Sequence, residues 1–165
     1  MDKITLASLA SFPGQLEAYY AAVPADHANW DSWQGIPSEP FTPIGQLCHV
    51  RDIEIDGYYA RIQRILRESN PALASIDGEK LARERGYATA SATEALGAFR
   101  AARVNTLALL SSLTPSQFAR TGVLEGYGPL TLRSLTHYLC SHDQQHLAGL
   151  QWLLGKIAAS HLAPH

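Results

Sequence analysis

Residues 131–155 read TLRSLTHYLCSHDQQHLAGLQWLLG, and this stretch decides the fold. It contains no proline, and its leucines recur every three or four positions, which is the spacing of one face of an α-helix. A Gly-Tyr-Gly-Pro turn precedes it at residues 126–129, and Gly155 stands where a glycine commonly follows the end of a helix. The sequence therefore predicts an amphipathic helix over about 131–155.

Two histidines interrupt the leucine face of this helix. His142 and His146 are four residues apart and share the face, whereas His137 falls on the opposite side. Their rings would be about 6 Å apart along the helix axis, close enough to bind one cation. Burying two imidazoles among leucines costs free energy unless their nitrogens find partners. Two interpretations follow: a metal site, or core histidines with hydrogen-bonded nitrogens.

Three further long segments have helical patterns. Thr42 is an N-cap residue before a proline at the first helical position, so a helix should run over about 42–69 and end before Pro71. Similar patterns cover about 3–23 and 88–113, and a short helix should begin at Gly78. Strand signals are absent. We expect an all-α four-helix bundle with long crossover connections, as a single domain over residues 1–165.

Composition narrows the class of protein. The chain has 165 residues and a formal net charge of −2, whereas proteins that bind nucleic acid use an excess of Lys and Arg. No stretch has the pattern of a signal peptide or the length of a membrane span. Cys48 and Cys140 are too few for a disulfide framework and fit reduced thiols. We expect a cytoplasmic protein that binds neither membrane nor nucleic acid.

A tight metal site needs a third ligand, and periodicity does not select it. The histidines outside the last helix are His27, His49, His161 and His165. His49 lies off the centre of its helix's apolar stripe, which comprises Ile44, Cys48, Ile55, Tyr59, Ile62 and Leu66. Carboxylates remain candidates as well.

Other polar residues stand at apolar positions. Asp143 and Arg103 both lie within helical core stripes, and they could form a buried ion pair or Arg103 could reach the surface. A functional interpretation makes Asp143 a partner of a metal-bound group and Arg103 an anion contact. With Asp52, they are the candidate catalytic residues. The arginines at 51, 61, 64 and 67 indicate a solvent-exposed helix face.

Several catalytic motifs are absent from the sequence. No glutamate has a histidine three residues later, which argues against a di-iron bundle, and there is no His-Glu-x-x-His zinc motif. His142-Asp143 is typical of HD phosphohydrolases, but these need a further downstream aspartate, and none follows Asp143.

The remaining pattern resembles the DinB-like superfamily. The resemblance rests on three motifs: His142-Asp143-x-x-His146, the segment 42–52 with His49, and Phe99-Arg-Ala-Ala-Arg103. The resemblance implies a four-helix bundle in which His49, His142 and His146 hold a divalent metal, and it implies homodimers. Some members of the family are thiol-dependent transferases or isomerases, and others are described as metal-dependent hydrolases.

Two functional hypotheses follow. The first is a metal-dependent thiol S-transferase or hydrolase of a small molecule, because an open three-histidine site can activate water or a thiol. The second is a stress-related metal- or ligand-binding protein without turnover. Zinc or nickel is the expected ion, with iron or manganese as alternatives, and a low-molecular-weight thiol is a possible second cofactor. Trp30 and Trp33 could line a pocket or cap the bundle end.

Overall fold

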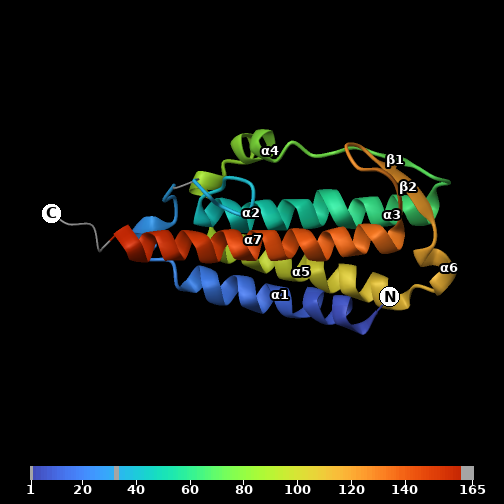
Figure 1. Ribbon diagram of the computed structural model, residues 1–165, viewed down its shortest axis with the longest axis horizontal. Coiled ribbons are helices and arrows are strands. Elements are labelled where there is room, and N and C mark those ends of the chain that lie inside the picture. Colours follow the sequence, from blue (N-terminus) through green and yellow to red (C-terminus); the bar gives the residue numbers. More distant parts are fainter. Residues whose placement is uncertain (1, 32–33, 161–165) are drawn as a thin grey trace.

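The computed structural model describes residues 2–31 and 34–160, and four long helical segments form its body (Figure 1). Two of them lie near the two ends of the chain, and two come from its middle. They are α1 (Lys3–Ala21), α2 (Pro43–Asp52) with its continuations η2 (Ile53–Tyr59) and α3 (Ala60–Arg67), α5 (Ala92–Ser112), and α7 (Leu132–Ser160). The expected four-helix bundle is confirmed.

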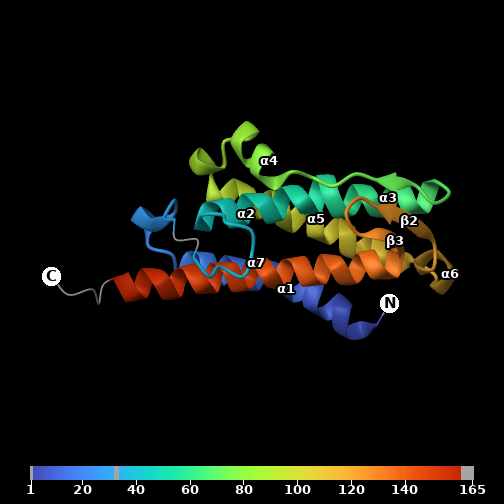
Figure 2. The same cartoon turned by 45° about the horizontal axis from the view of Figure 1, so that its top comes forward.

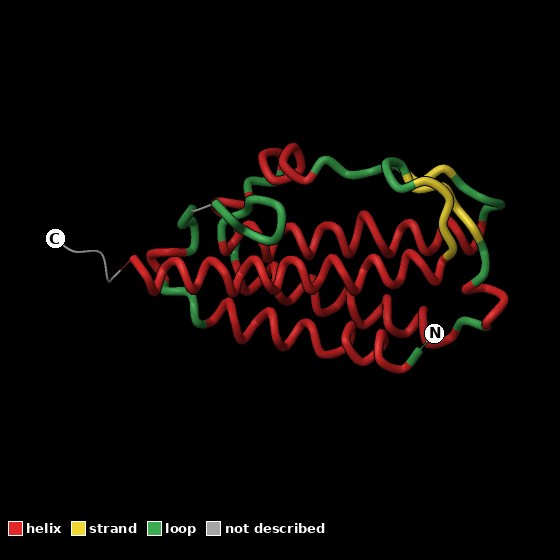
Figure 3. The backbone as a smooth tube through the Cα atoms, viewed as in Figure 1, coloured by secondary structure: helices red, strands yellow, loops and turns green. Residues whose placement is uncertain are grey.

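The topology of the bundle is set by its long crossover. In Figures 1 and 2, α1 and α7 run in one direction, and α2–α3 and α5 run in the other. Because α3 and α5 are parallel, the chain between them returns along the whole bundle, and it carries α4 (Gly78–Glu84) on the way (Figure 3). Helix α7 packs against α1 and α2, and α5 packs against the same two helices from the other side.

The local end signals account for most helix boundaries. The Thr42 hydroxyl accepts a hydrogen bond from the Gly45 amide, as the Thr-Pro start predicts. Asp2 caps α1, which runs through Pro13 without ending there. The predicted end at Gly155 is wrong, since α7 continues to Ser160. Gly155 is not among the glycines with positive φ, so it does not adopt the left-handed conformation that closes a helix.

A π-helical segment changes the face that the second bundle helix buries. Across η2 the i→i+5 pattern inserts extra residues into the 3.6-residue repeat, so the predicted stripe does not continue through it. Ile55 is 39% exposed, whereas Ile53 and Tyr58 are buried instead. The predicted stripe is therefore wrong beyond Cys48, until it resumes at Ile62.

A small sheet and several short helices also depart from the expectation of helices alone. The strand β1 (Ala72–Leu73) pairs parallel with β2 (Thr121–Leu124), which forms an antiparallel hairpin with β3 (Gly128–Thr131). The sheet lies at one end of the bundle (Figure 1). Strands this short leave no alternation to detect. The other short elements are η1 (Ala25–His27), η3 (Tyr87–Thr89) and α6 (Pro115–Phe118). Within the described residues, no helix is long and apolar enough to cross a membrane.

A buried charged layer divides the core into two apolar clusters. Arg103 forms paired hydrogen bonds with Asp143, at 2.6 and 2.9 Å, and with Glu54, at 3.0 and 3.1 Å, and it also donates to the Leu9 carbonyl. One apolar cluster contains Leu139 and the other Leu147, on either side of this layer along α7. The buried ion pair is thus the correct interpretation of Arg103 and Asp143, and Glu54 is a partner that the sequence did not reveal.

Removing the guanidinium should be costly. Arg103→Leu leaves two buried carboxylates without a counterion, and we expect the free energy of unfolding to fall by about 3–5 kcal/mol. Arg100→Leu is the matched control, because Arg100 lies one turn earlier on α5 and pairs with Glu17 at the surface; it should cost at most about 1 kcal/mol. Urea unfolding measures both, and equal losses would contradict this role of Arg103.

Candidate metal centre

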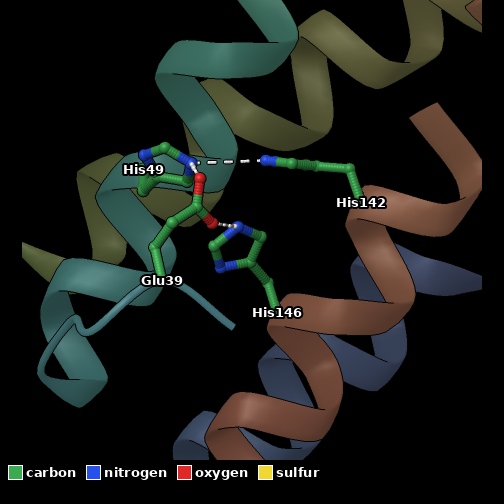
Figure 4. A group of neighbouring side chains, drawn as sticks. All are labelled: Glu39, His49, His142 and His146. Carbon is green, nitrogen blue, oxygen red and sulfur yellow. Dashed lines mark hydrogen bonds and ion pairs between the residues drawn. The ribbon is translucent and has the colours of Figure 1, made fainter. Parts of the chain in front are cut away.

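Three histidines and one glutamate converge between α2 and α7 (Figure 4). His142 and His146 come from α7, His49 comes from α2, and Glu39 comes from the loop before α2. One ligand atom from each lies within 4.8 Å of the others. Nε2 of His142 is 3.3 Å from Nε2 of His49, and Nε2 of His146 is 2.9 Å from Glu39 Oε2. The structure thus brings together the three histidines that the sequence singled out.

The position of His49 depends on parts of the fold outside the bundle. Phe41 stacks on its ring with centroids 4.7 Å apart, and a Cβ on Gly78, at the start of α4, would come within 2.8 Å of it. The crossover thus covers a second face of α2, which explains why His49 is only 2% exposed although it lies off the apolar stripe.

Glu39 is the member of the cluster that sequence reasoning missed. It belongs to an irregular loop, where helical periodicity gives no information about direction. The loop reaches the cluster because Gly149 of α7 has no side chain: a Cβ there would lie 2.2 Å from the Ser38 hydroxyl. A glycine in the middle of a helix was the available signal that side chains of another segment, here Ser38 and Gln46, pack closely against it.

Gln46 fixes the proton on His146. The Gln46 amide nitrogen donates to the carbonyls of Phe41 and Glu39, which can only accept. Its oxygen therefore faces His146 Nδ1, 2.5 Å away, and Nδ1 must carry the hydrogen. Nε2, the other ring nitrogen, faces Glu39 and the centre of the cluster, where a metal ion would bind it.

Burial lowers the pKa of two of the three imidazoles, those of His49 and His142. It lowers the pKa of His49 to about 4, helped by the charge of His146. Burial also lowers the pKa of His142 well below its ordinary value, and His146 and His49 add to the effect. For Glu39 burial acts in the opposite direction, but the neighbouring imidazoles outweigh it and lower the pKa. Neutral imidazoles beside an ionised carboxylate are the forms that bind a metal.

The donor set fits a divalent cation. Nitrogen ligands about 2.0–2.1 Å from a tetrahedral ion lie about 3.3 Å apart, which is the His49–His142 separation. Within the described residues, His146 Nε2 is buried without a hydrogen-bond partner and faces the cluster, whereas the other such atom, His49 Nδ1, faces Gly78 on the far side of its ring. Glu39 lies at ion-pair distance from His146 Nε2 but without hydrogen-bond alignment. A cation between these two atoms, a proton or a metal ion, stabilises their close approach.

The other candidate residues lie elsewhere. His27 contacts Asp26 and Trp30, and Trp30 does not line the cleft beside the cluster. Asp52 binds Arg51, Arg85 and the Tyr87 hydroxyl. Asp143 hydrogen bonds with Arg103, not with an imidazole. The remaining candidates are Trp33 in the loop before α2 and the histidines of the C-terminal tail, His161 and His165. All three lie outside the described residues.

A cleft of about 120 Å³ opens beside the cluster. His49, His142 and Glu39 line one side of it, and the β2–β3 turn and the segment after β1 line the other. The strands that the sequence did not predict therefore supply one wall of the candidate site.

Comparisons with known proteins agree with this fold. The model of the DinB superfamily matches residues 9–150. A solved structure described as "YfiT from Bacillus subtilis is a probable metal-dependent hydrolase with an unusual four-helix bundle topology" is similar, with a TM-score of 0.83 and 21% sequence identity. The match covers 96% of this chain and 90% of that one. None of the curated proteins matches the sequence significantly.

A methyl group on Gly149 should displace Glu39. We expect Gly149→Ala to weaken zinc binding about tenfold or more, the scale on which supporting contacts act on metal affinity. Gly155→Ala is the control, because it makes the same change in the same helix where a Cβ would meet nothing within 4 Å. Calorimetric titration with zinc compares the variants, and equal affinities would show that the loop does not position a ligand.

Proposed function

The chain belongs to the DinB superfamily, and from that premise we propose that it is a divalent-metal enzyme acting on a small molecule, by hydrolysis or by transfer of a thiol. The observation that carries the proposal is the meeting of three imidazoles and a carboxylate at the side of a cleft. The similar YfiT structure is described as a probable metal-dependent hydrolase, which supports the hydrolytic form of the proposal.

In this proposal His49, His142 and His146 would hold the ion, and Glu39 lies beside them, where it can bind the ion or accept a proton. A divalent ion at such a site acidifies a coordinated water or thiol, so that a nucleophile is available near neutral pH. Zinc and nickel both suit imidazole ligands, and iron or manganese are further alternatives.

The protein's own contributions are orientation and proton handling. Gln46 holds His146 in the tautomer whose Nε2 faces the cluster. Glu39 is half-exposed and ionised, so its carboxylate is the group placed to accept a proton from a nucleophile entering the cleft. Asp143, Arg103 and Asp52 act as positioning residues, because their hydrogen bonds fix α2, α5 and α7 rather than face the cleft.

A second candidate is a metal-binding protein without turnover, as in a stress-related binder. The size of the cleft favours it, since about 120 Å³ is less than the roughly 300–1,000 Å³ of most ligand pockets. A low-molecular-weight thiol or a short ester still fits a site of this size when part of the molecule extends into solvent.

The proposal extends to the location and the oligomeric state of the protein. We place the protein in the cytoplasm and expect a homodimer. The exposed side chains of Ile55 and Val104, 39% and 65% exposed, offer apolar surface on η2 and α5 for a second copy.

The activity assay separates the two functions. We expect zinc- or nickel-loaded protein to accelerate attack of thiols on a chromogenic electrophile, or hydrolysis of a chromogenic ester, at least about a hundredfold over His146→Ala. That variant lacks one of the three histidine ligands and differs from the wild type at no other position. If the loaded protein binds metal but reacts no faster than His146→Ala in either assay, the binder is the correct function.

A further inference from the structure

The wall of the cleft away from the metal cluster carries an arginine. Arg61 of α3 lines the cleft together with Tyr58, Tyr138 and Ser75. Its guanidinium lies over the Tyr58 ring, 5.9 Å from the centroid, and the Tyr58 ring in turn packs against His142. A continuous set of side chains thus leads from the imidazoles to the guanidinium.

Arg61 is held in place without being neutralised. Nη2 donates to the Ala74 carbonyl at 2.7 Å, which fixes the side chain against the segment after β1. In the part of the chain that the structure describes, no carboxylate lies within ion-pair distance of it. The Arg61 side chain is partly buried, and this burial lowers its pKa.

The two carboxylates on the cleft have other partners. Glu39 faces the imidazoles, and Glu125 accepts hydrogen bonds from the Ser75 amide and hydroxyl at 2.9 and 3.1 Å. A partly desolvated guanidinium with free donors costs free energy unless an anion reaches it. Arg61 is thus only partly exposed, rather than on the solvent-exposed face predicted for it, because the segment after β1 lies against its side chain.

We propose that Arg61 binds an oxyanion, most simply a carboxylate, on the small molecule that enters the cleft toward the histidine cluster. Tyr58 lies between the two ends and packs against the apolar part of that molecule. The assignment of the far end to a metal rests on the function proposed above, whereas the anion site rests on Arg61 alone.

The experiment compares two probes that differ in charge and hardly in shape. Propionate and propionamide are titrated into the protein, first metal-free and then zinc-loaded, and binding is followed by NMR chemical shifts of the cleft residues. In metal-free wild type, propionate should bind about tenfold more tightly than propionamide, as a charge-assisted hydrogen bond provides.

The variants assign this preference to one side chain. Arg61→Gln should remove it and leave the affinity for propionamide unchanged, and Arg61→Lys should keep part of it. Arg64→Gln is the matched control. Arg64 also lies on α3 and donates to a carbonyl near β1, that of Ala72, but it pairs with Glu68 outside the cleft. The Arg64→Gln variant should therefore keep the full preference for propionate over propionamide.

Two results would overturn the anion site: equal binding of both probes by metal-free wild type, or a preference that persists in Arg61→Gln. If Arg61→Gln loses the binding of propionamide as well as the preference for propionate, that variant has altered the cleft. Arg61→Lys then decides: a preference that is partly kept supports the anion site, and a preference that is lost while propionamide still binds contradicts it. Zinc affinity, measured separately, reports on the proposed metal function. If the protein binds no zinc, the proposed metal function fails, but the comparison of propionate with propionamide in metal-free protein is unaffected.

Discussion

Three imidazoles and an ionised carboxylate crowd into one poorly hydrated space, and the rest of the structure is arranged around that constraint. Gln46 holds a hydrogen on His146 Nδ1, so Nε2 is the ring nitrogen that faces Glu39 Oε2, 2.9 Å away. A cation between these two atoms stabilises their approach, and with a metal ion the four groups become a set of ligands. Gly149 and Gly78 permit the close approaches that complete it.

The charged layer next to the cluster positions the helices that carry it. Arg103 of α5 binds Glu54 on η2 and Asp143 on α7, and Asp143 is adjacent in sequence to His142. The π-helical segment lets one short stretch send Glu54 to Arg103 while Tyr58 lines the cleft. Such segments are frequent at functional sites, where an irregular backbone turns a side chain that regular helix would direct elsewhere.

The sequence predicts what depends on local signals. The Thr42-Pro43 start, the four helices and the inward direction of His142 and His146 follow from capping and a 3.6-residue period. Periodicity could not place His49, because a crossover far along the chain covers it, and resemblance to the DinB-like family supplied it. Glu39, Glu54 and the position of Arg61 depend on a loop, a π-helical insertion and a sheet of very short strands, which leave no periodic pattern.

The central claim is that an ion joins α2 to α7 in this protein. The most direct measurement is elemental analysis of untagged protein purified without chelators, compared with a variant in which His49, His142 and His146 are all alanine. We predict about one divalent ion per chain in the wild type and none in the variant. A wild type that is metal-free, and that takes up no zinc or nickel on dialysis against either ion, would contradict the account.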